Sequence, residues 1–523
     1  DIGRELNVDT VLEGSVRKSG NRVRITAQLI NVEDGYHLWS ETYDRELTDI
    51  FTIQDEISRA IVDALMVHLT DEQIAAVTPT QTAQPANVDA YNFYLLAKHN
   101  LRLRNETALK LAIRQYQRAL DSDPGYAQAY AGQALATHLL STRGYGDIPI
   151  KIANREAQAL LDRAFALDPN LPEAHATQGL LLADRLDYDG AERSFRRAIA
   201  GNPSEGIVYS WLHTVVGGKG DYNESIRILE QAFAIDPLHP AIRNNMANAV
   251  ARAGNNAKAR EMMTPGTAAA YMVEAFIELD AGNWANMRES MEQALKVSER
   301  GGITRSSTVI GLFSFYVLGD TGEEAAAIPE HIRLVQKALR DPARGQQYLS
   351  EIPPEEQDDW YTYTMAWLYL LQGENAQALH SLQRSFDPGQ PIYGDAGSSF
   401  APMDFASMYA LALIRLGREE EGLALAQRAL DFVALAKSNG EPPGALSRYE
   451  AEANAVMGNE AAVIGALKEG WSNYYLSWTD FESPMLLPLA DNPEIAELRE
   501  AVLAHVNAER QKLGWEPLQV ARL

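Results

Sequence analysis

The sequence predicts a mainly α-helical protein, an α-solenoid of paired helices preceded by a small, truncated α/β domain. Three observations support this fold class. Prolines and small residues recur at a spacing of 34 residues through the middle of the chain. After residue 88, apolar residues return every third or fourth position, which is typical of amphipathic helices. Before that point, apolar and polar residues alternate, which indicates strands.

The amino-acid composition limits the classes of molecule that this chain can bind. The 523 residues include 71 acidic and 46 basic side chains, so the formal net charge is −25. Such a chain should repel nucleic acid and anionic membrane surfaces, and we expect no nucleic-acid partner. No cysteine is present, which excludes disulfides, thiol catalysis and cysteine-ligated zinc. No apolar run reaches about 18 residues, so we expect no membrane span within this chain.

The first seventy residues read as strands followed by a helix. From Val11 to Ile30 the pattern alternates on both sides of a Ser19-Gly20-Asn21 turn, which predicts a β-hairpin. A third strand is expected around His37 to Thr42. A helix is expected over 52–65, where isoleucine and leucine recur every fourth residue. Composition then shifts to Thr, Gln and Pro, which predicts a linker at 70–88.

Residues 1–69 resemble the second half of a TolB-like amino-terminal domain. The motifs that carry this resemblance are Gly14-Ser15-Val16, Asp34-Gly35, His37-Leu38-Trp39 and Asp44-Arg45. In bacteria such domains stand between a membrane segment and helical repeats, in adenylate cyclases and winged-helix regulators. The resemblance implies a further strand and helix before this point, so we expect this chain to be part of a longer protein.

Two features of this region leave alternatives open. The sheet edge that the absent strand would cover is exposed, so it either frays or pairs with another chain and forms a homo-oligomer. The basic residues of the hairpin form either a docking patch or the solvated side of a half-buried sheet. They are Arg17, Lys18, Arg22 and Arg24.

The repeats are clearest over 172–203. There Gly179 is followed by Ala191, Phe195 and Ala198, and Pro169, Pro203 and Pro237 are each 34 residues apart. This unit resembles the tetratricopeptide repeat, which implies a right-handed superhelix of stacked helix pairs. We expect about nine or ten repeats over 89–490, followed by a capping helix and tail at 491–523.

The sequence contains no phosphate-binding loop, no HExxH motif and no GxSxG elbow. We therefore expect no enzyme activity, no metal site and no cofactor. An enzymatic alternative would need a site in the long loop near residue 390 or in the aromatic stretch 469–481.

The resemblance to tetratricopeptide repeats implies a concave groove lined by the first helix of each pair. Counting from the small residue of each repeat predicts that partner-binding side chains come from four repeats. Paired asparagines can hold an extended peptide, because an amide both donates and accepts hydrogen bonds. The tryptophans form either a binding surface or core between repeats. The predicted residues are Asn244, Asn248, Arg252, Trp360, Tyr363, Trp367, Arg415 and Arg448, with Asp404, Ser407, Leu411 and Glu452 beside them.

Together these features favour a non-catalytic interaction or sensory module that binds a protein or peptide. From the resemblance, we expect the periplasmic part of a bacterial inner-membrane signalling protein whose output domain lies upstream. The alternative is a cytoplasmic assembly scaffold without a membrane link. An apolar run of about 20 residues before Asp1 would distinguish the two.

Overall fold

A computed structural model describes residues 8–20, 22–46, 88–141, 150–299, 330–354, 359–394, 402–442 and 444–518, with isolated positions between them. The predicted helix at 52–65 and the predicted linker at 70–88 lie almost entirely outside the described residues. The chain divides into two compact units. One comprises residues 1–96 and 115–129, and the other residues 97–114 and 130–523.

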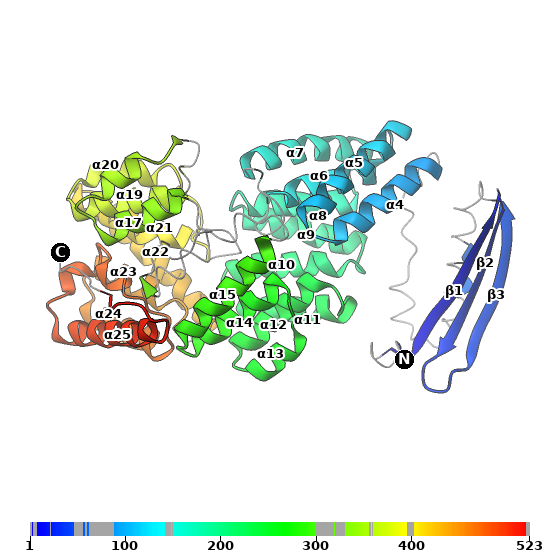
Figure 1. The fold of residues 1–523 in the computed structure, drawn as a ribbon. Helices are drawn as coiled ribbons and strands as arrows, with labels where there is room; N and C mark the ends of the chain where they lie inside the picture. The colour runs from blue at the N-terminus through cyan, green and yellow to red at the C-terminus, as the bar shows by residue number, and fades with distance from the viewer. Residues whose placement is uncertain are drawn as a thin grey trace. The chain divides into compact units, whose positions relative to one another are not determined.

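The first unit contains the sheet, an antiparallel meander in the order β1-β2-β3 (Figure 1). The strands are β1 Thr10–Ser19, β2 Arg22–Asn31 and β3 His37–Glu46. The predicted hairpin is therefore confirmed, and the third strand runs four residues beyond its predicted end. Leu12 pairs with Leu29 and Val16 with Ile25, so the apolar side chains share one face of the sheet.

The opposite face of the sheet carries charge. Arg22 and Arg24 both donate hydrogen bonds to the carboxylate of Asp44, at 2.8 and 2.5 Å. Hydrogen bonds from Arg24 and Arg22 hold the pKa of Asp44 below its ordinary value. Both arginines remain largely exposed. Two of the four basic residues of the hairpin are thus paired with a single carboxylate of the neighbouring strand.

Three helices begin after the sheet: α4 Val88–Arg102, α5 Glu106–Ser122 and α6 Ala127–Leu139. In the first unit, the ring of Tyr94 packs against those of Tyr116 and Tyr126, with centroids 5.9 and 5.0 Å apart. All three rings are buried. This aromatic contact joins the helical residues of the unit.

The second unit is a succession of antiparallel helix pairs (Figure 1). Within a pair the two helices pack along their length, as in α8–α9, α10–α11 and α14–α15. The helices of its first part are α7 Ile150–Leu167, α8 Pro172–Ala183, α9 Tyr188–Gly201, α10 Gly206–Gly218, α11 Tyr222–Ile235, α12 Pro240–Arg252, α13 Asn256–Met262, α14 Ala268–Asp280 and α15 Trp284–Glu299.

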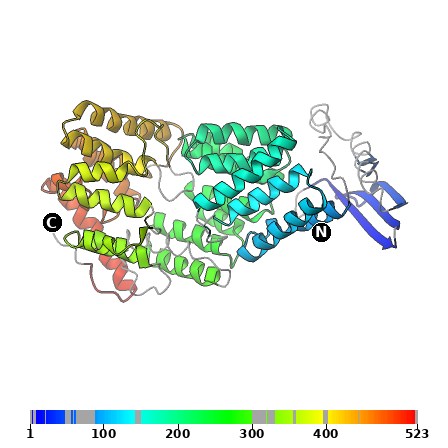
Figure 2. The same cartoon turned by 90° about the horizontal axis from the view of Figure 1, so that it is seen from above.

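The second unit continues with the same arrangement. First helices of successive pairs pack on one another: α8 packs on α10, α10 on α12 and α12 on α14. In the same way, α17 packs on α19, α19 on α21 and α21 on α23. Figure 2 shows the array from above. This stacking confirms the predicted α-solenoid. The elements are α17 Glu330–Arg340, α18 Gly345–Ser350, α19 Asp359–Leu371, α20 Asn375–Leu382, α21 Pro402–Arg415, α22 Glu419–Ser438, α23 Ser447–Val456, α24 Glu460–Ser472, η3 Asp480–Glu482, η4 Leu487–Leu489 and α25 Pro493–Lys512.

The local sequence explains where these helices begin and how closely the two helices of a pair approach each other. The side chains of Asp187 and Asp221 accept hydrogen bonds from backbone N–H groups in the first turns of α9 and α11, at 2.9 and 3.1 Å. A Cβ atom on Gly179 would lie 2.5 Å from the ring of Phe195. Only glycine therefore lets α8 approach α9 to the distance seen here.

The final helix, α25, differs from a simple end cap. It packs on α24, as a cap should, and it also packs on α15, more than 190 residues earlier. The backbone N–H of Ala285 donates to Glu509 at 2.9 Å, and Nε2 of His505 lies 2.8 Å from the carbonyl oxygen of Gly282. Among the described residues, no helix is both long and apolar enough to cross a bilayer.

Candidate partner-binding cleft

The candidate site is a cleft in the second unit, which we call the interhelical cleft. One wall is formed by α10, α11 and α12, and the other by α22, α23 and the turn between them, with Gly394 and Met403 beside them. Its volume is about 460 Å³. Both first helices of pairs, such as α10, α12 and α23, and second helices, such as α11 and α22, line this cleft.

One face of α12 supplies the polar groups of the first wall. Asn245, Asn248 and Arg252 are three and four residues apart, so they project from the same side of the helix. Asn245 donates to the hydroxyl of Ser210 at 2.9 Å. Among the described residues, the side chain of Asn248 makes no hydrogen bond, which leaves one amide donor and acceptor available to a ligand.

His213 of α10 adds an acceptor to the same wall. Its Nδ1 lies 3.0 Å from the carbonyl oxygen of Ser225, which can only accept, so Nδ1 carries the proton. Burial lowers the pKa of His213, and the ring is therefore neutral near pH 7. Within the described part of the chain, its Nε2 atom makes no hydrogen bond, so this atom can accept one from a ligand. Ser225 Oγ lies 2.7 Å from Nδ1 and also donates to the His213 carbonyl, so this pair is structural and no nucleophile is activated.

Arg252 lies at the end of α12 and contacts the opposite wall. Its Nη2 atom lies 2.5 Å from a carboxylate oxygen of Glu441, which belongs to the turn after α22. Its guanidinium also lies over the ring of Tyr222, 5.1 Å from the centroid. One charged group of the cleft is thus paired within the chain.

A second polar cluster lies beside the cleft and joins α19, α21 and α23. Arg448 donates to Asp404 at 2.7 Å and lies 3.4 Å from the hydroxyl of Tyr363. Tyr449, which lines the cleft, donates to the same carboxylate of Asp404 at 2.9 Å. The structure therefore brings together Tyr363, Asp404 and Arg448, predicted from three separate repeats.

Glu452 extends this cluster into the interior. It is 2% exposed and accepts a hydrogen bond from Ser483 at 3.0 Å. Burial raises the pKa of Glu452 to about 7, and burial also raises the pKa of the nearby Asp480. Two buried carboxyl groups therefore share the environment of one arginine, Arg448.

The other residues that were predicted to bind a partner do not line the interhelical cleft. Tyr363 and Trp367 are 8% and 5% exposed and belong to the core, and Trp360 is half-buried against the same core. This burial favours the core interpretation of the tryptophans. Arg415 is exposed and donates to the carbonyl of Leu370 at 2.8 Å. Asn244 does not line the cleft, and its buried Oδ1 atom has no hydrogen-bond partner among the residues that the structure describes.

The structure adds residues that the sequence did not suggest. Asn245 occupies the face assigned to Asn244, and its spacing of three and seven residues to Asn248 and Arg252 was a usable signal. Glu441 and Tyr449 come from distant repeats. No repeat pattern indicates which distant repeat faces α12, because the pattern describes only contacts between neighbours.

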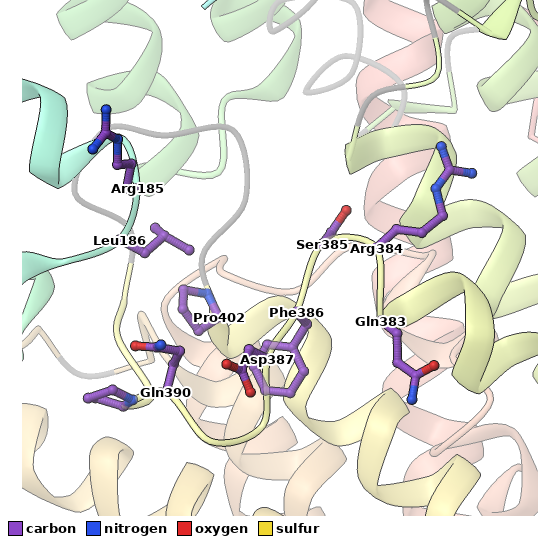
Figure 3. A pocket seen from close by; sticks show the side chains of 10 residues that line it. Arg185, Leu186, Gln383, Arg384, Ser385, Phe386, Asp387, Gln390 and Pro402 are labelled. Carbon is purple, nitrogen blue, oxygen red and sulfur yellow. The ribbon is translucent and has the colours of Figure 1, made fainter. Parts of the chain in front are cut away.

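A smaller cavity of about 310 Å³ lies between the α8–α9 turn and the segment after α20, near the loop considered for an enzymatic site (Figure 3). In Figure 3, the guanidinium groups of Arg185 and Arg384 do not point toward one another. The acidic residue described at this cavity is Asp387, which accepts from the N–H of Gly389 at 2.8 Å and so shapes a turn. These residues do not converge on a common point.

The aromatic stretch 469–481 packs between helices. Trp471 lies edge-on to Trp284 of α15 and to His505 of α25, with centroids 6.5 and 5.7 Å away. Trp478 and Phe481 are buried. Within the described part of the chain, no group of three or more His, Asp or Glu side chains has a geometry that could hold a metal ion.

Comparison with solved structures finds partial similarities. A structure titled "MamA 41-end from Desulfovibrio magneticus RS-1" is 16% identical, with a TM-score of 0.24, and covers 34% of this chain and 92% of that chain. YrrB, described as a TPR protein with an unusual peptide-binding site, is 19% identical, with a TM-score of 0.24, over 35% of this chain and 91% of its own.

Comparison with curated proteins finds a Rhizobium meliloti (strain 1021) protein that carries the name of an adenylate cyclase. It is 36% identical over 194 residues, which is 37% of this chain and 32% of that protein. The chain thus spans about a third of the length of this relative. The family model of the tetratricopeptide repeat matches residues 218–275, from the end of α10 into α14. The chain therefore contains a tetratricopeptide-repeat region.

Proposed function

We propose that this chain is a non-catalytic binding module that holds a peptide segment of a partner protein in the interhelical cleft. The observation that carries the proposal is the polar face of α12 inside a cleft of about 460 Å³, where Asn248 has no partner among the described residues. Tetratricopeptide-repeat regions are protein–protein interaction modules, and their concave surfaces are the usual place of contact.

The chemistry of the cleft suits an extended peptide. Such a peptide exposes one N–H and one carbonyl per residue, and the amide of Asn248 can satisfy both kinds of group. Neutral His213 supplies an acceptor. Apolar side chains from both walls, among them Ile226, Phe432 and Leu446, offer contacts for the side chains of a bound peptide.

For the biological context, we infer a bacterial signalling protein in which residues 1–69 belong to a TolB-like domain. The support is the set of sequence motifs in that region and the similarity to a protein named as an adenylate cyclase. A cyclase or winged-helix output domain would lie in another part of the complete protein. We place this part in the periplasm, as in the domain arrangement that the motifs resemble.

The location is testable with a compartment reporter. An alkaline phosphatase fused to the carboxyl end of the complete protein is expected to be active in living cells, because this enzyme needs the oxidising periplasm to form its disulfides. A fusion that is expressed but inactive would place the repeats in the cytoplasm and favour the assembly scaffold.

Binding is testable with phage-displayed random peptides selected on the wild-type chain. Asn248→Ala should weaken binding of the selected peptides by about 1–3 kcal/mol, the range for losing a hydrogen bond to a buried or charged group. Asn244→Ala is the matched control on the same helix, because Asn244 lies outside the cleft, and it should leave affinity unchanged. Equal losses in both variants, or a loss in Asn244→Ala alone, would remove the cleft from consideration.

A further inference from the structure

The solenoid contacts itself across the interhelical cleft. In an array of repeats each unit normally contacts only its neighbours. Here the turn that follows α22 touches α12, α11 and the turn before α11, with partners 189 to 219 residues apart in the sequence.

The contacts of this turn are polar. We define the Glu441 turn as residues 437–442. The carbonyl oxygen of Asn439 accepts from the backbone N–H of Asn223 at 2.9 Å, and the side-chain amide of Asn439 donates to the carbonyl of Gly220 at 3.1 Å. Glu441 pairs with Arg252. The turn is therefore held to the first wall by two hydrogen bonds and one ion pair.

The Glu441 turn occupies groups that a ligand would otherwise use. The Glu441 side chain is 13% exposed and that of Arg252 is 33% exposed, and both residues line the cleft. An arginine is always charged, so Arg252 keeps a strong requirement for an anionic partner. In this structure the chain itself supplies that anion.

The base of the turn belongs to the second wall. Lys437 lies 2.5 Å from Glu450 of α23 and 2.6 Å from Glu469 of α24. These two ion pairs fasten the turn to the helices that follow it. Opening of the cleft would therefore carry the Glu441 turn away together with α22 and α23.

A second long-range contact in the same unit has the opposite character. Trp284 of α15 is fully buried and lies edge-on to His505 of α25, with centroids 4.5 Å apart, and to Trp471 of α24. Separating this contact would expose a fully buried tryptophan, whereas separating the Glu441 turn from α11 and α12 breaks two hydrogen bonds and one half-buried ion pair. We call the contact of Trp284 with His505 and Trp471 the aromatic seam. It is the firmer of the two long-range contacts, and the polar contact of the Glu441 turn is the weaker.

We propose that the Glu441 turn is a latch that covers the interhelical cleft in cis and competes with the partner for Arg252. This inference rests on the proposed function for its purpose, although the latch itself can be measured without a partner. The latch opens by separation of the turn from α11 and α12, while the aromatic seam stays closed. A different segment makes contacts of its own with the first part of the unit: the backbone N–H of Gly394 donates to the carbonyl of Gly218 at 2.8 Å, and the ring of Tyr393 stacks on that of Tyr188, with centroids 4.6 Å apart. The latch comprises only the contacts of residues 437–442.

The experiment measures the opening directly. Because the chain has no cysteine, nitroxide labels can be placed at engineered cysteines only. One labelled pair spans the latch, Arg227→Cys on α11 and Ala434→Cys on α22, both exposed positions. A second pair, Glu289→Cys on α15 and Ala508→Cys on α25, spans the aromatic seam. Pulsed electron paramagnetic resonance then gives both distance distributions.

The test variant combines Glu441→Gln with Asn439→Ala. The glutamine keeps the shape and one acceptor but removes the charge, and the alanine removes the hydrogen bond to Gly220. The matched control is Glu421→Gln, which removes an exposed charge from α22 where it pairs with Arg418. In the test variant the latch pair should shift to longer distances, and the seam pair should not. Neither pair should move in the control.

Peptide affinity provides the second reading. If the closed latch is favoured about tenfold, removing it should raise the apparent affinity of cleft-binding peptides about tenfold. Unchanged latch distances in the test variant would overturn the proposal. Longer distances without any gain in affinity would show that the turn does not guard the cleft. A failure of all peptides to bind would count against the proposed function only, because the distances still test the latch.

Discussion

Glycine 179 sets the distance between two helices through a single missing atom. The Cβ of an alanine at this position would lie 2.5 to 2.8 Å from three atoms of the Phe195 ring, which is buried and has little space to move. Such overpacking forces either the ring or the helix to shift. The small residue that identified the repeat in the sequence thus has a direct steric reason.

A pair of glycine substitutions tests this point. Gly179→Ala should destabilise the protein by about 1–3 kcal/mol, the usual cost of overpacking a core. Gly465→Ala is the matched control, because Gly465 is helical, exposed and has no atom within 4 Å of an added Cβ. It should stabilise by about 0.5–1 kcal/mol through helix propensity. Urea unfolding followed by circular dichroism measures both, and a similar effect of the two changes would argue against close packing at Gly179.

Glu452 makes stability depend on pH. Its folded pKa is about 7, raised by burial, whereas an unfolded glutamate titrates near 4.3. Between these values the folded state holds a proton that the unfolded state has lost, so stability falls as pH rises from about 4.5 to 7. The groups that face Glu452 are Arg448, Asp404, Asp480 and Ser483. Arg448 opposes the shift and the two aspartates reinforce it.

Glu452→Gln should remove most of this dependence, because the amide oxygen still accepts from Ser483 but no proton is exchanged. We expect the wild-type chain to lose about 2–3 kcal/mol of stability between pH 5 and 8 from this group, and the variant to lose less. Urea titrations at the two pH values give the comparison. Parallel losses in the two proteins would place the responsible group elsewhere, with the buried Asp480 as the first alternative.

At the scale of elements, α15 depends on a distant helix for its first turn. The carboxylate of Glu509 accepts from the N–H of Ala285, so a residue of α25 acts as the amino-terminal cap of α15. The negative charge also complements the positive end of the helix dipole. A helix capped from so far along the chain cannot form its native terminus before α25 is in place.

Glu509→Ala should therefore destabilise α15 by about 1–2 kcal/mol, within the range for losing a cap. The substitution leaves one backbone donor of α15 buried and unpaired. Hydrogen exchange resolved to single amides should show faster exchange at Ala285, with α8 unchanged. Glu500→Ala, an exposed position on the same helix, serves as the control. If exchange at Ala285 is as slow in Glu509→Ala as in the control, the carboxylate does not cap this helix.

Some of these elements and contacts could be predicted from the sequence, and others could not. The hairpin from Val11 to Ile30 and the helix pairs with Gly179 and Ala198 were predictable, because strand alternation and repeat spacing are local signals. The second contact of α25 was not, since its polar surface looked solvated. Two charged residues of α25, Glu509 and Arg510, are buried, with their hydrogen bonds directed to a helix terminus and to the carbonyl of Leu318. A charged residue that is buried by distant partners looks the same in the sequence as a charged residue on the solvated face of a helix.

At the scale of the whole second unit, the cleft could be predicted only in part. Repeat positions selected Asn248 and Arg252, which line the cleft, because position along a helix decides which face a residue occupies. They also selected Tyr363 and Trp367, which are buried. Tyr363 packs against Phe405 of the neighbouring α21, with centroids 6.2 Å apart, so it belongs to the core between repeats. Which distant repeat faces the cleft depends on how far the array curves. Curvature accumulates from small rotations at every repeat, so it cannot be read from one of them.

Long-range contact should also make distant repeats depend on one another. Deletion of residues 493–523 removes α25, the partner of Trp284 and of the first turn of α15. We expect amide protection to fall in α15 as well as in the adjacent α24, while α8 and α9 keep theirs. Hydrogen exchange by mass spectrometry provides the measurement. Loss of protection confined to α24 would mean that the aromatic seam contributes little.

The contact between Gly220 and Asn439 also has a consequence for synthesis on the ribosome. The two residues are 219 positions apart, and translation proceeds at about 5–20 residues per second, so their emergence is separated by about 10–40 s. During that interval the wall formed by α10 to α12 can fold on nearest-neighbour contacts alone, with no turn to cover it. Nascent chains would therefore pass through a stage in which Arg252 has no anion, and an acidic segment of a chaperone or of the partner itself could occupy the cleft before the protein is finished.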